Sequence, residues 1–346
     1  MTSLPHRIMG STFSLINIFL LSIISLNFQV DGSVIGLNYG LLGDNIPPPN
    51  QVISLVKSRN VSRIRLFSPD HNVLNSLQNS GVEVIVGTFN NDTQGLATDI
   101  NFAKNWVQTN IVPFSQMVTF RCISVGNEVI ANDLASFVFP AIKNLNAALQ
   151  SFNLGQIPVS TTIGIYLLAS SSPPSNADFS SDVKPTMQEI TGFLAGNGFP
   201  LLVTAYPYFS YVYDPSGIPL SFVLLNSTDV VVRDGNLEYT NMFDAMVDAM
   251  YWALEKVGAG SVEVVICESG WPSNGNGNFT TIGLAQTYNQ NLVKHVLNSG
   301  TPKKPEKNVE TYVFAIFNED LKPPGVEQNF GLFYPNMSEV YHIDLN

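Results

Sequence analysis

In the first half of the chain stands Cys122-Ile123-Ser124-Val125-Gly126-Asn127-Glu128, a run of apolar and β-forming residues that closes on a glutamate. A second run of this kind, Val262 to Cys267, leads directly into Glu268. Further runs rich in β-branched and aromatic residues are spread along the chain: Val34 to Tyr39, Arg63 to Phe67, Glu83 to Phe89, Val159 to Ile163, Leu201 to Ala205 and Thr311 to Phe317. The sequence therefore predicts eight strands, of which the fourth and the seventh end beside a glutamate.

Helix-length segments separate most of these strands: Pro48 to Arg59, Gly95 to Thr109, Leu134 to Phe152, Val183 to Leu194, Thr240 to Val257 and Ile282 to Leu297. Such alternation indicates a parallel sheet, and strands that are apolar on both faces suit a closed barrel. An open doubly wound sheet is the alternative, but Gly36-Leu37-Asn38-Tyr39-Gly40 lacks the spacing of a phosphate-binding loop. We therefore predict an α/β fold, a single (β/α)8 TIM barrel over residues 33–346.

Residues 1–32 have the pattern of a secretory signal peptide. His6 and Arg7 precede an apolar run, and Val30-Asp31-Gly32 supplies a small-residue cleavage site. Polar residues interrupt the run, which disfavours a membrane anchor. Glycosylation sequons also fit the secretory route, at Asn60, Asn91, Asn226, Asn278 and Asn336. We expect a monomeric protein that is secreted to the extracellular space or the cell wall, without a lipid anchor, because no hydrophobic stretch stands at the C-terminal end.

Charge and cysteine content narrow the class of protein further. Removing residues 1–32 takes away one positive and one negative charge, so the net charge stays at −11 and argues against a nucleic-acid partner. Cys122 and Cys267 are the only cysteines. Cys267 adjoins Glu268 and should point to the opposite face of its strand, whereas Cys122 lies six positions before Glu128 and should share its face. We expect two buried free thiols and no disulfide.

The two strand-end glutamates indicate the chemistry. Catalytic residues of a β/α barrel stand at the C-terminal ends of its strands, and the fourth and seventh strands lie across the barrel mouth from each other. Cleavage of a sugar acetal needs two carboxyl groups that face each other across one bond. Glu128 and Glu268 are therefore candidates for such a pair.

With further motifs the chain resembles the plant β-1,3-glucanases of glycoside hydrolase family 17 along essentially the whole mature sequence. The similar segments include Cys267-Glu268-Ser269-Gly270-Trp271-Pro272-Ser273, Ile35-Gly36-Leu37-Asn38-Tyr39-Gly40, Tyr206-Pro207-Tyr208-Phe209, Asn241-Met242-Phe243-Asp244-Ala245-Met246-Val247-Asp248-Ala249 and Asn329-Phe330-Gly331-Leu332-Phe333-Tyr334-Pro335-Asn336. The resemblance implies a secreted glucan endo-1,3-β-D-glucosidase that hydrolyses internal β-1,3 bonds by a retaining double displacement, with β-1,3-glucan as its partner.

The resemblance also implies roles for individual residues. Glu268 would be the nucleophile, Glu128 the general acid and later the base, and Asn127 a neighbour of the sugar 2-hydroxyl. Additional polar cleft residues would be Glu319, Lys322 and Glu327. Where many members carry tyrosine after the second strand this chain has Phe67, and where tyrosine is frequent before Pro173-Pro174 it has Ser172.

Aromatic residues at the predicted strand ends complete the expected site. For Tyr39 and Tyr206 we expect contact with glucose rings, and Phe67 stands at the same end of its strand. For Tyr208 and Phe209 we leave open whether the side chain packs in the core or contacts the sugar. The stripe of apolar residues in Thr240 to Val257 is expected to pack against the barrel.

Glu128 must start protonated to act as an acid. An unperturbed glutamate would be only about 2% protonated near pH 6, so its pKa must be raised, and the negative charge of Glu268 is the expected cause.

Two other functions remain open at this point: hydrolysis of mixed-linkage β-1,3-1,4-glucan, and a barrel that binds glucan without cutting it. The histidines show no metal-ligand spacing, and we expect neither a metal nor another cofactor.

Overall fold

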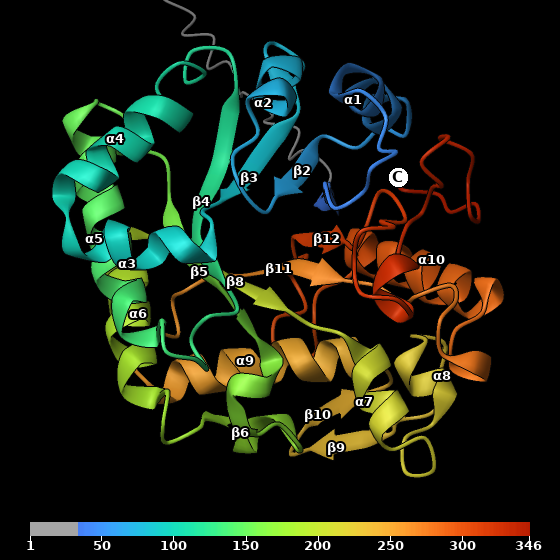
Figure 1. Ribbon diagram of the computed structural model, residues 1–346. Coiled ribbons are helices and arrows are strands. Elements are labelled where there is room, and N and C mark those ends of the chain that lie inside the picture. The colour runs from blue at the N-terminus through green and yellow to red at the C-terminus, as the bar shows by residue number, and fades with distance from the viewer. Residues whose placement is uncertain (1–33) are drawn as a thin grey trace, which may run out of the picture. The chain divides into compact units, whose positions relative to one another are not determined.

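The computed structural model describes residues 34–346, so the expected signal peptide lies outside the described residues and stays a prediction. Eight parallel strands form a closed barrel in the order β1-β12-β11-β8-β5-β4-β3-β2, which confirms the predicted fold (Figure 1). Their bounds are β1 (Ile35–Asn38), β2 (Arg63–Leu66), β3 (Glu83–Gly87), β4 (Thr119–Asn127), β5 (Val159–Gly164), β8 (Leu201–Thr204), β11 (Val264–Ser269) and β12 (Thr311–Val313).

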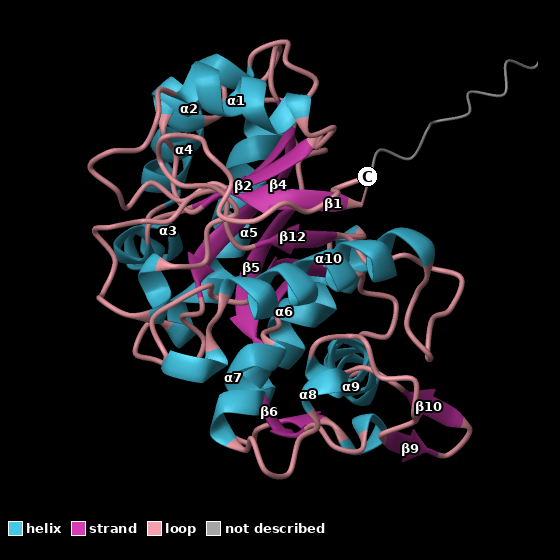
Figure 2. Ribbon diagram, turned by 90° about the vertical axis from the view of Figure 1, so that its right-hand side faces the viewer, coloured by secondary structure: helices cyan, strands magenta, loops and turns pink. Residues whose placement is uncertain are grey.

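Helices surround the strands (Figure 2). They are α1 (Pro49–Ser58), α2 (His71–Leu77), α3 (Thr93–Thr98), α4 (Ile100–Asn110), α5 (Ala135–Ser151), α6 (Lys184–Asn197), α7 (Pro207–Tyr213), α8 (Leu220–Val223), α9 (Met242–Lys256) and α10 (Ile282–Asn298). Short 3-10 turns are η1 (Asn90–Asp92), η2 (Ile165–Leu167), η3 (Pro174–Asn176), η4 (Gly277–Phe279) and η5 (Val326–Gln328). Two small hairpins pair β6 (Leu168–Ser170) with β7 (Asp178–Phe179) and β9 (Val232–Asp234) with β10 (Leu237–Tyr239).

One predicted helix was wrong in its extent. The segment Gly95 to Thr109 is divided between α3 and α4 at Asp99, whose backbone is extended. The Asp99 side chain accepts a hydrogen bond of 2.8 Å from the Asn101 amide, as the N-cap of α4. An aspartate before a helix stabilises a new N-terminus in this way, and the periodicity of apolar residues does not reveal it.

Six buried residues from five strands fill part of the barrel interior: Ile85, Cys122, Leu202, Val265, Cys267 and Tyr312. Both thiols are free, as expected, and burial raises the pKa of each to about 12. The parity argument behind that expectation was wrong, because Cys122 and Cys267 lie in the same cluster. The register of β11 shifts between Ile266 and Glu268, so side chains there do not alternate strictly.

The outer layer of the core lies between strands and helices. On α9 the apolar stripe Phe243, Met246, Val247, Met250 and Leu254 is buried, which confirms the expected packing. Leu254 is fully buried near the end of this helix, whereas Lys256, two positions further along, is exposed.

This contrast yields a stability prediction. Leu254→Ala removes a buried side chain and leaves a cavity, so we expect the free energy of unfolding to fall by about 2–5 kcal/mol. Lys256→Ala, on the exposed face, should change it by less than about 0.5 kcal/mol. Urea unfolding of both variants measures the difference, and equal midpoints would contradict the packing assigned to α9.

Candidate active site

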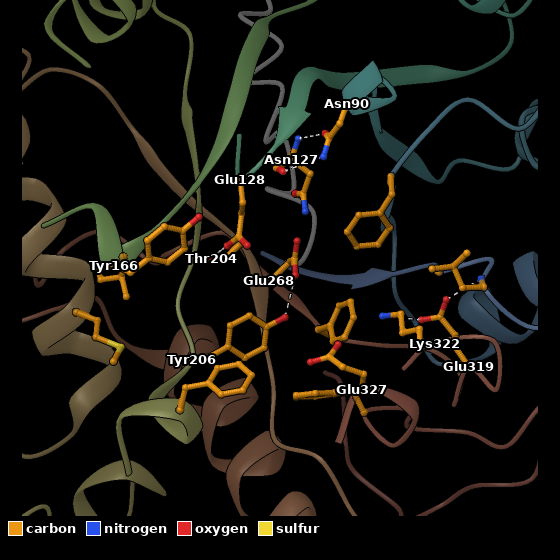
Figure 3. A pocket seen from close by; sticks show the side chains of 18 of the residues that line it. Asn90, Asn127, Glu128, Tyr166, Thr204, Tyr206, Glu268, Glu319, Lys322 and Glu327 are labelled. Atoms are coloured by element: carbon orange, nitrogen blue, oxygen red, sulfur yellow. Dashed lines mark hydrogen bonds and ion pairs between the residues drawn. The ribbon is translucent and has the colours of Figure 1, made fainter. Parts of the chain in front are cut away.

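A cleft of 1210 Å³ opens at the C-terminal ends of the strands, where the segments that follow β1, β2, β3, β4, β5, β8, β11 and β12 line it. All nine residues expected at the site line this cleft: Tyr39, Phe67, Asn127, Glu128, Tyr206, Glu268, Glu319, Lys322 and Glu327. Figure 3 shows Glu128 and Glu268 next to one another in it. The barrel thus brings together carboxyl groups that lie 140 positions apart in the sequence.

Glu268 is held from two sides at the end of β11. Its Oε1 accepts a hydrogen bond of 2.5 Å from the Arg65 guanidinium, and its Oε2 accepts one of 2.9 Å from the Tyr206 hydroxyl. Glu268 is 8% exposed, and Arg65 only 1%. The orientation of this carboxylate is fixed because both of its oxygens accept a hydrogen bond, one of them from a cation.

Arg65 also contacts the other side of the site. One terminal nitrogen donates to Asn38 Oδ1 at 3.2 Å, and the other donates to Asn127 Oδ1 at 2.7 Å and Thr162 Oγ1 at 3.2 Å. The Phe67 ring lies 4.4 Å from the guanidinium carbon. The fork of donors on arginine allows this one side chain to orient residues from four other strands, β1, β4, β5 and β11.

A local turn aims Glu128 into the cleft. Gly126 and Glu128 both have positive φ, 65° and 56°, and the pairing of β4 with β5 shifts register between Ser124 and Asn127. The Glu128 amide donates to Thr162 O at 3.0 Å and the Asn127 amide to Asn90 Oδ1 at 2.8 Å, so the unusual backbone is hydrogen-bonded throughout. A non-glycine residue with positive φ stores strain, which is commonly found at functional sites.

The surroundings of the Glu128 side chain differ from those of Glu268. No cation is in contact with it among the described residues, and its Oε1 accepts a hydrogen bond from the Thr204 hydroxyl. Burial is the largest cause that raises the pKa of Glu128. The charge of Glu268 raises this pKa further, whereas Thr204 and Arg65 act in the opposite direction. The expected shift is therefore present, but the charge of Glu268 is its secondary cause and not its main one.

Tyr166 is a site residue that the sequence did not reveal. Its ring crosses Gly164 at the end of β5, where a Cβ atom would lie 2.0 Å from the ring. Figure 3 shows its hydroxyl directed toward Glu128. Burial and the charges of Glu128 and Glu268 raise the pKa of Tyr166 to about 12, so its hydroxyl stays protonated and can donate a hydrogen bond.

The aromatic side chains have different positions. Tyr39 is 1% exposed, so the contact of its ring with glucose that we expected does not fit this burial. Tyr206 is half-buried, and its ring packs edge-on against Phe314 and Phe330 at 6.2 and 5.9 Å. The hydroxyl of Tyr206 donates to Glu268, so this residue positions the carboxylate, and its expected contact with a glucose ring stays a prediction. Tyr208 is 1% exposed and packs against Trp271, so it belongs to the core.

Glu319 and Glu327, which follow β12, differ in their burial and in their contacts with the protein. Glu319 is 3% exposed, accepts from the Leu42 amide at 2.8 Å and pairs with Lys322 Nζ at 3.1 Å. These contacts join the loop after β1 to the loop after β12. Glu327, in η5, is half-buried in the cleft, and its charge contributes to the raised pKa of Glu128.

The raised pKa of Glu128 predicts a stability effect. Since this pKa is higher in the folded protein than in the unfolded chain, ionisation of Glu128 costs stability as the pH rises through these values. Glu128→Gln removes the cost, so the melting temperature of this variant should rise relative to that of the unmodified protein as the pH increases from about 4, the ordinary range of a glutamate, through the raised pKa of Glu128. The exposed Glu189→Gln serves as the control. The same pH dependence in both variants would contradict the assignment.

Known proteins of the same architecture match the chain along almost its whole described length. Residues 35–345 match the sequence profile of Glycosyl hydrolases family 17. A relative from Hordeum vulgare is 50% identical over 312 residues, 90% of this chain and 96% of that protein. A glucan endo-1,3-beta-glucosidase of Pisum sativum is 43% identical over 335 residues, 95% of this chain and 90% of that protein.

Solved structures agree. A β-1,3-glucanase and allergen of Cryptomeria japonica pollen is 46% identical with a TM-score of 0.87, over 90% of this chain and 99% of that one. A structure described among two plant β-glucan endohydrolases with distinct substrate specificities is 41% identical with a TM-score of 0.86, over 89% of this chain and 99% of that one. With the family profile matched over nearly all of residues 34–346, the chain belongs to glycosyl hydrolase family 17.

Proposed function

We propose that this family 17 glycoside hydrolase cleaves internal β-1,3 bonds of β-glucans with retention of anomeric configuration. The observation that carries the proposal is the contrast between two carboxyl groups in one cleft: Glu268 is paired with the Arg65 guanidinium, whereas Glu128 contacts no cation among the described residues and its pKa is raised. A retaining glycosidase needs one carboxylate and one carboxylic acid at the start of its reaction. The activities named for the relatives supply the substrate class.

In the first step Glu268 attacks the anomeric carbon and forms a glycosyl ester. The bond from that carbon to the glycosidic oxygen breaks, and Glu128 gives its proton to this oxygen, which leaves as a hydroxyl group. Arg65 and Tyr206 keep the attacking carboxylate in place, which lowers the entropic cost of the step.

In the second step Glu128 acts as a base. It takes a proton from water, whose oxygen attacks the anomeric carbon and releases Glu268 as a carboxylate. Formation of the ester removes the charge of Glu268, so the pKa of Glu128 falls. Because burial is the larger cause of the shift, part of the increase remains in the ester.

The size of the cleft supports internal cleavage. Its 1210 Å³ exceed the about 300–1,000 Å³ that are usual for small-molecule sites. The cleft reaches from Leu41 and Leu42 after β1 to Tyr213 and Asp214 at the end of α7. A glucan chain therefore has room on the enzyme beyond the two sugars that flank the cleaved bond.

For the location, we propose secretion of a monomer to the extracellular space or cell wall. The sequon residues Asn60, Asn91, Asn226, Asn278 and Asn336 are exposed, which is compatible with glycan attachment. Among the described helices, none is both long and apolar enough to span a bilayer.

Substitutions of the two glutamates test their roles. Glu268→Gln should lower kcat on linear β-1,3-glucan by about 10⁴-fold or more, because the nucleophile is lost. Glu128→Gln should lower it by about 10²- to 10⁴-fold, and by less on an aryl glycoside whose leaving group needs no proton. Reducing-sugar release measures the first substrate and absorbance the second.

Glu189→Gln is the matched surface control and should keep full activity. Full activity of Glu268→Gln would contradict the proposed nucleophile. Binding of the glucan without any cleavage by the unmodified protein would leave a glucan-binding barrel instead of an enzyme.

Mixed-linkage β-1,3-1,4-glucan is the second candidate substrate. The 41% identical structure belongs to a pair of plant β-glucan endohydrolases with distinct substrate specificities, so the choice between the two polymers has to be tested. We expect faster cleavage of linear β-1,3-glucan, and equal or faster cleavage of the mixed-linkage polymer would reverse the assignment.

A further inference from the structure

Helix α7 leaves two aromatic side chains open to solvent at the wall of the cleft. Phe209 is 46% exposed and Tyr213 is 92% exposed, and both line the cleft. They are four positions apart, so they lie on the same face of the helix, about 6 Å apart along its axis. Two other aromatic residues of α7 are packed: Tyr208 against Trp271, and Tyr211 against Trp271 and Phe279.

The two exposed rings are connected to Glu268 through Tyr206. Phe209 packs edge-on against Tyr206 at 5.5 Å, and the Tyr206 hydroxyl donates to Glu268. Tyr213 lies one helical turn further from this contact. Ser210, Asp214, Ile218 and Met246 line the same region, so polar groups border the exposed rings.

Packing inside the protein does not account for this exposure. Tyr213 is the most exposed of the large hydrophobic side chains described, and the structure gives its ring no aromatic partner among residues 34–346. An exposed apolar group bordered by polar residues is typical of a binding surface. An aromatic ring offers a flat apolar face and little conformational entropy to lose, which suits the C–H face of a sugar ring.

We propose that Phe209 and Tyr213 form a distal subsite that stacks on glucose rings of a β-glucan chain away from the cleaved bond. This inference rests on the proposed function, since its ligand is the same polysaccharide. It assigns to Tyr213 a role in selecting long chains, because a short oligosaccharide bound across Glu128 and Glu268 ends before it reaches the end of α7. Tyr213 is thus a binding residue and takes no part in bond cleavage.

The test compares Tyr213→Ala and Tyr213→Phe on β-1,3-linked glucose oligosaccharides of increasing length. For Tyr213→Ala the ratio of kcat/KM on long chains to that on short chains should fall about 3- to 10-fold, through KM. Tyr213→Phe keeps the ring and should keep the ratio. Tyr334→Ala, which removes a 41% exposed tyrosine outside this cleft, is the matched control and should also keep it.

An unchanged ratio in Tyr213→Ala, or an equal loss at all chain lengths, would overturn the subsite while leaving the proposed reaction intact. A second readout does not depend on catalysis. In native gels that contain linear β-1,3-glucan, Glu268→Gln should be retarded, and Tyr213→Ala added to it should restore most of its mobility. Equal retardation of both proteins would also overturn the subsite. If the unmodified protein cut no glucan, the proposed function would fail, and the gel would still decide on the subsite.

Discussion

The contact between Arg65 and Glu268 fixes the geometry on which the rest of the site depends. A guanidinium with 1% exposure is costly to bury unless its donors are satisfied, and residues of four strands, β1, β4, β5 and β11, accept hydrogen bonds from its two terminal nitrogens. Arg65 thus holds one oxygen of Glu268, and the second donor, Tyr206, holds the other. Removal of the cation would leave a buried carboxylate unpaired and release Asn127, next to Glu128.

The contact with Arg65 also makes the surroundings of the two glutamates different. Glu268 is paired with the Arg65 guanidinium, whereas Glu128 stands in a half-buried position with a threonine hydroxyl as its neighbour. Burial and the negative charge of Glu268 then both favour a proton on Glu128. One carboxylate and one carboxylic acid arise from identical side chains because their surroundings differ.

Much of this could be predicted from the sequence. The apolar β-runs fixed the eight strands and hence the barrel, and the position of Glu128 and Glu268 after two of them placed both at its mouth. Arg65 was missed, although a charged residue within the apolar run Arg63 to Phe67 was a usable signal. No local sequence pattern predicted Tyr166 at the site, since the position of its ring depends on the absence of a side chain at Gly164. Strand parity failed for the cysteines because register shifts break the alternation between Ser124 and Asn127 in β4 and between Ile266 and Glu268 in β11. Tertiary contacts of this kind are not encoded in local patterns.

The proposed retaining mechanism requires a covalent bond between Glu268 and the sugar. Incubation with a β-1,3-linked 2-deoxy-2-fluoro glucoside that carries a good leaving group should trap that ester, because the fluorine slows its hydrolysis more than its formation. Mass spectrometry of the digested protein is the direct readout. The proposed mechanism predicts one added glycosyl group on the peptide that contains Glu268. An adduct on another residue, or no adduct together with inverted configuration in the first product of glucan cleavage, would contradict it.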